Sequence, residues 1–574
     1  MGQSSVFDVP YLVIHFSVLA ACPAWGVASE NLPRRGQFAP HSSPYGSALG
    51  QDGGENRTAA AKLRPPVLRS GWLLASLAGV FVFAAAVCAQ GIPPAAPAQP
   101  AAAPVQPAAA PAQAAVEVEP PLPATLPPAL AHALRLAKLP AAAVGLHVQE
   151  VGSARVLASL NPERAFNPAS VMKLVTTFAA LELLGPSFTW KTGFHESGTR
   201  RGDVLEGDLV IRGSGDPKFT QEQLWLALKA LRARGLREIR GNVILDRGAF
   251  DANGYDPGKF DGDPLRAYNA GPDALLVNFK AIALTFVPDE ATGSVNVTVE
   301  PKLAGLPVRS AVRLVQGPCA DLRAYPVKPK IDLTGGISVT GTYAASCGVR
   351  SWWLHPFELS QVQYTGAVLR ALWADLGGVL AGDVREGVLP TGARLVLEAE
   401  SQALAEVVRD INKFSNNVMA RQLFLTLSSE VLRLPGHPER SARAVKTWLA
   451  EKKIGGEELV MENGSGLSRV ERISAGALGR LLVAAFRSPV MPELVASMPL
   501  VAYDGTMRRR LKSRDVAGQA HIKTGTLNDV RSIGGYVLAA SGKRYAVVCI
   551  VNHQNLAGAQ ALHDALLQWV HGEG

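Results

Sequence analysis

Three short motifs in this sequence combine serine hydroxyls, lysine amines and a carboxamide at spacings that suit acyl transfer. They are Ser170-x-x-Lys173, Ser415-x-Asn417 and Lys523-Thr524-Gly525. On a helix, residues three apart lie on one face, so the Lys173 amine can reach the Ser170 hydroxyl. A serine hydroxyl is a weak nucleophile until a neighbouring base activates it. A lysine can be that base when burial or a nearby cation lowers its pKa.

The first two motifs provide the groups that make and break bonds. We expect Ser170 to attack a carbonyl carbon while Lys173 accepts its proton. Ser415 is expected to relay a proton to the leaving group, and Asn417 to hold a backbone amide of the substrate. This arrangement is the Ser-Lys variant of the serine hydrolase scheme, which uses no essential histidine.

The third motif provides the groups that hold the substrate. Lys523 and Thr524 are expected to bind a terminal carboxylate. Gly525 lets the strand approach the substrate closely, because it has no side chain to block that approach. The backbone N–H groups of Ser170 and Thr526 are the expected oxyanion hole. We expect no cofactor, and no metal because no H-E-x-x-H or C-x-x-C spacing occurs.

Each motif alone is weak, because copies of two of them occur elsewhere in the chain: Lys191-Thr192-Gly193, Ser159-x-Asn161 and Ser294-x-Asn296. Context favours the first set. Ser170 opens an apolar helical run, and Ser415 lies in a stretch, 404–427, with a helical pattern. Lys523 lies on a strand that begins an antiparallel meander, whereas no such meander follows Lys191.

The elements around the motifs predict a mixed α/β chain. A hairpin of strands precedes Ser170 (141–149 and 156–160), and three strands with a closing helix end the chain (521–526, 533–539, 545–552 and 556–570). Short strands between turn residues predict a β-rich region over 190–390, interrupted by one helix at 221–234. Further helices are expected at 364–376, 441–451 and 475–486.

Composition and charge narrow the classes of partner. The chain has 574 residues and a net charge of +9. Basic residues are not interleaved with aromatic ones, so we expect no nucleic-acid binding. Basicity also suits a protein that works beside anionic envelope polymers. Cys319 and Cys347 can form a disulfide in an exported protein or remain buried thiols, and the sequence leaves both open.

The N-terminal region carries an export pattern. Basic residues precede an apolar run at 72–86, and small residues follow at 87–89. We expect residues 1 to about 61 to come from a start codon assigned too far upstream. The rest of 1–89 is expected to be a signal peptide. An uncleaved signal-anchor is the alternative, and the only membrane contact expected. Residues 90–128 are rich in Ala and Pro and are expected to form a tether.

The motif set resembles the class C low-molecular-mass penicillin-binding proteins, the type-4 D-alanyl-D-alanine carboxypeptidase/endopeptidases. The long separation of Ser170 and Ser415, the run 207–217 and the run 464–469 carry this resemblance over about 130–570. It implies an α/β (α+β) transpeptidase-like domain, with an antiparallel sheet flanked by helices and interrupted by two nested β-rich domains. The catalytic domain is then expected at 129–190 and 391–574, and the insert at 191–390.

The resemblance also implies a function. Family members act in the periplasm on peptidoglycan stem peptides, trimming the terminal D-Ala and cutting D-Ala–diaminopimelate cross-links. It implies that β-lactam antibiotics acylate Ser170. Asn416 stands where the family often has Asp, and this change should be tolerated. The alternatives are a non-catalytic envelope-binding protein of the same fold and a serine β-lactamase or esterase.

Overall fold

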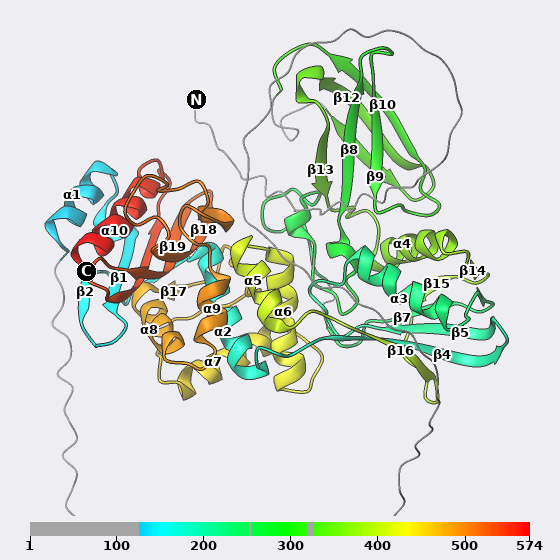
Figure 1. Ribbon diagram of the computed structural model, residues 1–574, viewed down its shortest axis with the longest axis horizontal. Coiled ribbons are helices and arrows are strands. Elements are labelled where there is room, and N and C mark those ends of the chain that lie inside the picture. The colour runs from blue at the N-terminus through cyan, green and yellow to red at the C-terminus, as the bar shows by residue number, and fades with distance from the viewer. Residues whose placement is uncertain (1–125, 252–253, 320–326) are drawn as a thin grey trace, which may run out of the picture. The chain divides into compact units, whose positions relative to one another are not determined.

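The computed structural model describes residues 126–251, 254–319 and 327–574 (Figure 1). The expected upstream start and signal peptide, and all but the last residues of the expected tether, lie outside these ranges. Helix α1 (Pro128–Leu136) begins at the last residue of that tether. Within the three ranges, no helix has both the length and the apolar character needed to cross a membrane.

The two ends of the described chain build one antiparallel sheet. Its five strands follow the order β18-β19-β20-β1-β2. Their bounds are β1 Val144–Glu150, β2 Val156–Leu160, β18 Ala520–Leu527, β19 Val530–Leu538 and β20 Arg544–Asn552. The predicted hairpin and the predicted meander are therefore both present. Strand β18, which carries Lys523, lies at one edge of the sheet.

Helices cover both faces of this sheet, and strand alternation explains why. In β20, Ala546, Val548 and Ile550 join the core that contains α2 (Met172–Leu184) and α8 (Ala475–Phe486). The alternate residues Tyr545, Val547, Cys549 and Val551 join the core that contains α1 and α10 (Ala559–Glu573). Burial on both faces accounts for the almost continuous apolar sequence of the strand.

The helix expected at 404–427 is wrong as a single element. The structure has α5 (Leu404–Lys413) and α6 (Asn417–Val431), separated by a turn in which Ser415 has φ +56°. The Asn416 side chain caps α6 by accepting the Met419 N–H at 3.0 Å. Ser and Asn side chains compete for backbone hydrogen bonds and favour caps over helix interiors, so the apolar pattern of the flanking turns hid the break.

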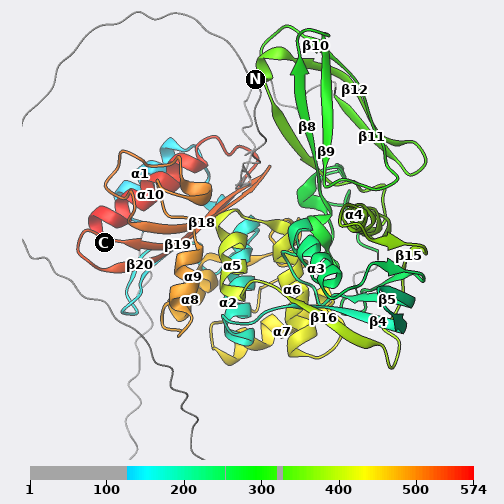
Figure 2. The ribbon, with the colours of Figure 1, turned by 45° about the vertical axis from the view of Figure 1, so that its right-hand side comes forward.

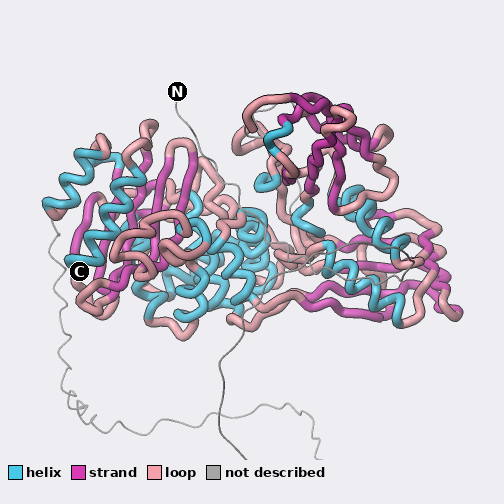
Figure 3. Tube along the Cα trace, turned by 45° about the horizontal axis from the view of Figure 1, so that its top comes forward, coloured by secondary structure: helices cyan, strands magenta, loops and turns pink. Residues whose placement is uncertain are grey.

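Helix α7 (Pro438–Glu451) lies close to its expected position, and α8 has the bounds that the sequence predicted. Helix α9 (Met491–Ser497) was not predicted from the sequence. A two-stranded sheet joins the chain before the Ser170 turn to the chain before α8: β3 Ala165–Phe166 and β17 Ile473–Ser474. Figure 3 shows a cluster of helices, in cyan, beside the strands of the sheet at the C-terminal end of the chain.

Between α2 and α5 the chain builds two further sheets. The first has seven strands: β4 Lys191–Arg201, β5 Val204–Arg212, β6 Glu238–Ile239, β7 Val243–Asp246, β14 Val379–Leu380, β15 Val384–Glu386 and β16 Arg394–Glu400. Helices α3 (Gln221–Ala233) and α4 (Gln361–Asp375) pack beside it (Figure 2). Because β16 pairs with β4, this sheet continues past residue 390, where the sequence placed the end of the insert.

The second sheet has six strands in the order β11-β12-β10-β9-β8-β13. Their bounds are β8 Ile282–Asp289, β9 Ser294–Glu300, β10 Val308–Val315, β11 Lys328–Asp332, β12 Gly336–Ala344 and β13 Arg350–Leu354. Cys319, after β10, and Cys347, after β12, form a disulfide. The structure thereby decides between the two states that the sequence left open for these cysteines.

Candidate active site

Ser170 lies in a tight turn that leads into α2. The turn spans Ala169–Val171, and Ala169 has φ +45°. Asn167 stabilises this turn, because its Oδ1 accepts the Ala169 N–H at 2.9 Å. Asn167 is itself held to the end of β20 by a reciprocal pair of hydrogen bonds with Asn552, at 2.8 and 2.9 Å. The sheet thus fixes the position from which the serine hydroxyl points.

Lys173 is fully buried in the first turn of α2 and has three polar neighbours. Its Nζ lies 2.6 Å from Asn417 Oδ1, 2.5 Å from the Ser465 carbonyl oxygen and 3.0 Å from Ser170 Oγ. The first two neighbours can only accept hydrogen bonds. A neutral amine has two N–H bonds, so donating both leaves its lone pair directed at the Ser170 hydroxyl. This is the geometry that a general base requires.

Lys523 forms the second half of the site. It is fully buried on β18, and its Nζ donates to Ser415 Oγ at 2.8 Å and to the Thr524 carbonyl at 2.6 Å. The Thr524 hydroxyl is paired with the Thr506 hydroxyl at 2.8 Å. The structure therefore joins the second motif to the third directly, and the first to the second through Asn417.

The two lysines have unusual electrostatics. Burial, followed by the charges of Lys523 and Arg421, holds the pKa of Lys173 well below its ordinary value. Burial lowers the pKa of Lys523 to about 7. A buried ammonium without a carboxylate partner is costly, which is why both pKa values fall. A lysine that can be neutral near neutral pH can accept a proton from serine.

Gly525 is needed by the protein itself. A Cβ built on this residue would lie 2.2 Å from Ser532 Oγ, 2.7 Å from the Pro168 carbonyl and 3.0 Å from the Ser170 nitrogen. A second reason for glycine therefore adds to the expected close approach of a substrate: β18 packs against the turn that carries Ser170. Thr526 follows on the same strand with an exposed side chain.

The sequence argument missed several residues of the site. Ser465 and Gly466 lie in the run 464–469, which the sequence marked only through the family resemblance. The Ser465 carbonyl contacts Lys173, and a Cβ on Gly466 would lie 1.9 Å from the Ala169 carbonyl oxygen. No pattern in the sequence distinguishes a backbone carbonyl or a buried cation such as Arg421 as part of a site.

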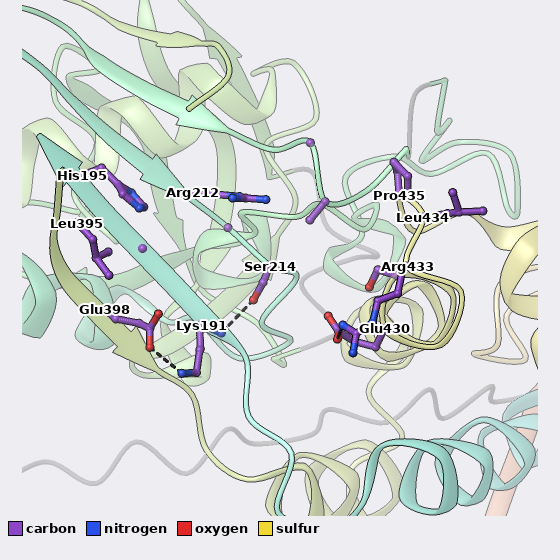
Figure 4. Close-up of a pocket in the computed structure, with 15 residues that line it drawn as sticks. Lys191, His195, Arg212, Ser214, Leu395, Glu398, Glu430, Arg433, Leu434 and Pro435 are labelled. Atoms are coloured by element: carbon purple, nitrogen blue, oxygen red, sulfur yellow. Dashed lines mark hydrogen bonds and ion pairs between the residues drawn. The ribbon is translucent and has the colours of Figure 1, made fainter. Parts of the chain in front are cut away.

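The second Lys-Thr-Gly copy lines a different hollow. A cavity of about 490 Å³ is bordered by Lys191, Arg212 and Ser214 on one side and by Glu430 and Arg433 on the other (Figure 4). None of the eight predicted site residues lines it. Strand β4, which carries Lys191, pairs antiparallel with β5, but β5 pairs parallel with the next strands, β6 and β7. No antiparallel meander therefore follows Lys191, as the sequence indicated.

The partner of the lysine also separates the two copies. Lys191 is exposed and forms an ion pair with Glu398 at 2.8 Å. Lys523 is buried and contacts the serine of the second motif.

Residues 127–571 match the D-Ala-D-Ala carboxypeptidase 3 (S13) family. The chain belongs to this family. It is 24% identical over 417 residues to the D-alanyl-D-alanine carboxypeptidase DacB of Haemophilus influenzae, covering 71% of this chain and 85% of that protein. It is 28% identical over 454 residues to the D-alanyl-D-alanine carboxypeptidase of an Actinomadura species, covering 75% and 81%. The protein is accordingly a D-Ala-D-Ala carboxypeptidase, a hydrolase.

Solved structures agree on the fold of this carboxypeptidase. Penicillin binding protein 4 (dacB) of Haemophilus influenzae superposes with a TM-score of 0.64 at 22% identity, covering 76% of this chain and 99% of that one. The same protein complexed with a novel β-lactam gives 0.62 at 21% identity, covering 77% and 99%. The α/β transpeptidase-like fold that the motifs implied is confirmed.

Proposed function

We propose that this carboxypeptidase works through an acyl-enzyme on Ser170, with Lys173 as the general base. One observation carries the proposal. The Lys173 amine is buried, both of its N–H bonds have acceptors in Asn417 and Ser465, and its lone pair is left for the Ser170 hydroxyl at 3.0 Å.

Acylation follows from these positions. Ser170 Oγ bonds to the carbonyl carbon of the penultimate D-Ala while its proton passes to Lys173. The C–N bond then breaks, and the departing amine takes the proton that Lys173 had accepted, relayed through the Ser415 hydroxyl, which Lys523 holds at 2.8 Å. The N–H groups of Ser170 and Thr526 receive the oxyanion. Water later cleaves the ester, returning the proton to Ser170.

Substrate binding is assigned to the third motif and Asn417. The Lys523 ammonium and the Thr524 hydroxyl bind the terminal carboxylate, and Thr526 extends the contact along β18. The Asn417 amide nitrogen stays available for a substrate carbonyl, because its Oδ1 is occupied by Lys173. Gly525 keeps the strand close to Ser170, so the anchored carboxylate and the attacked carbonyl lie within one short peptide.

The same chemistry makes β-lactams inhibitors. A β-lactam presents a strained amide and a nearby carboxylate, so it acylates Ser170 by the same steps. A likeness supports this: the Haemophilus structure of the same fold is complexed with a β-lactam. Peptidoglycan stem peptides are the proposed natural substrates, with both terminal D-Ala release and cross-link cleavage, in the periplasm. The export pattern before residue 90 supports that location.

Covalent labelling by a fluorescent penicillin tests the mechanism. We expect label that survives denaturation in the wild type and is absent in Ser170→Ala, Lys173→Ala and Lys523→Ala. The second copies provide matched controls, because Ser294→Ala and Lys191→Ala should label normally. No label on folded wild type would favour the binding-protein alternative, and rapid turnover of the drug would favour a β-lactamase. Muropeptide assays then separate carboxypeptidase from endopeptidase activity.

A further inference from the structure

A buried carboxylate beside the candidate site has no role in the chemistry described so far. Glu471 precedes β17 and has no exposed surface. Its Oε1 accepts three successive backbone N–H groups, from Glu462 at 3.1 Å, Asn463 at 2.9 Å and Gly464 at 3.0 Å. Burial raises the pKa of Glu471, and the three donors directed at one oxygen, together with the charge of Lys173, oppose that rise by favouring the ionised carboxylate.

These three N–H groups belong to the segment that runs directly into Ser465. The Ser465 carbonyl accepts the Lys173 N–H at 2.5 Å, and the Gly464 carbonyl accepts the Thr176 hydroxyl at 2.7 Å. Because each peptide unit is planar, only the φ and ψ angles of Gly464 and Ser465 separate the units that Glu471 holds from the Ser465 carbonyl. By holding 462–464, Glu471 therefore restricts the direction in which the Ser465 oxygen points.

Glu471 also supplies negative charge to a site rich in buried cations. Lys173 is surrounded by α6, which carries Arg421 and Asn417, by β18, which carries Lys523, and by the loop that Glu471 holds. Arg421 is buried and, within the described residues, donates to two backbone carbonyls without forming an ion pair. The charges of Lys523 and Arg421 lower the pKa of Lys173, and that of Glu471 raises it.

We propose that Glu471 is a positioning residue for acylation: it fixes the Ser465 carbonyl that turns the Lys173 amine toward Ser170, and its negative charge offsets the buried cations around that amine. This proposal rests on the Ser170 mechanism proposed above. Glu471 acts through Lys173. Its two contributions are its negative charge and the side-chain length that lets it hold the backbone of 462–464. Different substitutions change one and keep the other.

The test is the rate constant of penicillin acylation as a function of pH. Glu471→Gln keeps the shape of the side chain and removes its charge, so the pKa of Lys173 should fall. The acid limb of the pH–rate profile should then move to lower pH by about 0.5–1 unit. Glu471→Asp keeps the charge but shortens the side chain by one methylene. The acid limb should stay at the wild-type pH, while the plateau of the acylation rate constant falls about tenfold or more. Glu458→Gln is the control, because its carboxylate also accepts a backbone N–H, from Ser474 at 2.9 Å.

Each outcome decides the proposal. An acid limb at the wild-type pH in Glu471→Gln, or a wild-type plateau in Glu471→Asp, would overturn it. If Glu471→Gln does not fold, Glu471→Asp alone decides through its plateau. Label that disappears in Ser170→Ala establishes the serine mechanism separately, so a negative result then concerns Glu471 alone. Absence of acylation in the wild type would overturn both proposals.

Discussion

At the scale of single residues, the candidate site depends on two lysines whose pKa values are lowered by burial. Neither Lys173 nor Lys523 has a carboxylate within hydrogen-bonding distance among the described residues, and both are fully buried. Burial makes the neutral amine accessible, and the neighbouring acceptors determine where its N–H bonds point. The proposed division of labour gives Lys173 the proton transfer and Lys523 the charge that binds a carboxylate.

This division predicts a pH dependence for substrate binding. The pKa of Lys523 is lowered to about 7 by burial, so the residue is charged below that pH and loses its charge above it. KM for a D-Ala-D-Ala peptide should therefore rise as the pH increases through about 7. Lys523→Arg should be less active at every pH but should have a KM that is flat from about pH 6 to 9, because arginine stays protonated. Parallel KM profiles in the two proteins would contradict the assignment.

At the scale of elements, the site is assembled where short turns meet. The Ser170 turn, the Ser415 turn and the loop 462–471 each contain a residue with positive φ: Ala169, Ser415, Gly464 and Gly466. The loop 462–471 packs against the backbone of the Ser170 turn, and side chains from α2, α6 and β18 connect both to the Ser415 turn. Small changes in a turn should therefore affect both folding and acylation.

Gly466→Ala tests this packing. Its Cβ would lie 1.9 Å from the Ala169 carbonyl, so unfolding should become easier by about 1–3 kcal/mol and acylation should slow sharply. Gly456→Ala is the matched control, because Gly456 also has positive φ but has no atom closer than 3.9 Å to the added Cβ. Urea denaturation and penicillin acylation measure the two effects. Equal losses in both variants would mean that backbone strain, and not contact with the Ser170 turn, is responsible.

An ion pair links the Ser415 turn to the loop that carries Thr506. Lys413 Nζ lies 2.6 Å from Asp504 Oδ2, with 7% of the lysine side chain and 41% of the aspartate side chain exposed. Asp504→Asn leaves a buried charge without its partner, and partial exposure keeps the cost to about 1–3 kcal/mol. Denaturant unfolding should show this loss, accompanied by slower acylation. Asp515→Asn, on the exposed part of the same loop, should leave both unchanged.

At the scale of the whole molecule, the proposed reacting residues lie outside the inserted sheets. The serine, both lysines and the asparagine come from segments on either side of the two inserted sheets. The disulfide Cys319–Cys347 lies wholly within the insert, at the six-stranded sheet. The division into a catalytic domain and inserted domains stays a prediction, with the seven-stranded sheet continuing to residue 400 through β16.

Reduction of this disulfide should therefore affect stability more than activity. The bond closes a loop with a sequence separation of 28, which corresponds to roughly 3–4 kcal/mol in the chain-entropy account. Cys347→Ser should lower the melting temperature of the insert while the penicillin acylation rate stays near the wild-type value. Scanning calorimetry and labelling, each with and without reductant, measure the two. A large fall in acylation would show that the insert supports the site.

The sequence by itself determined the groups for chemistry and most elements. The Ser-x-x-Lys spacing placed Lys173 one helical turn from Ser170, and the strand pattern predicted the meander that carries Lys523, because both depend on local periodicity. The break at Ser415 was missed, because apolar turns on both sides continue the helical pattern. The strand pattern also distinguished Lys523 from Lys191, because β18 begins a run of consecutive antiparallel strands and β4 does not.

Only the tertiary structure decided which distant groups meet. The Ser465 carbonyl, Arg421 and Glu471 belong to the surroundings of Lys173 through contacts between segments far apart in the chain. Their effect depends on burial, which changes pKa values through desolvation, and on distances that spacing along the sequence does not contain. The motifs therefore predicted the reacting residues, and the tertiary structure decides the burial and direction of their side chains.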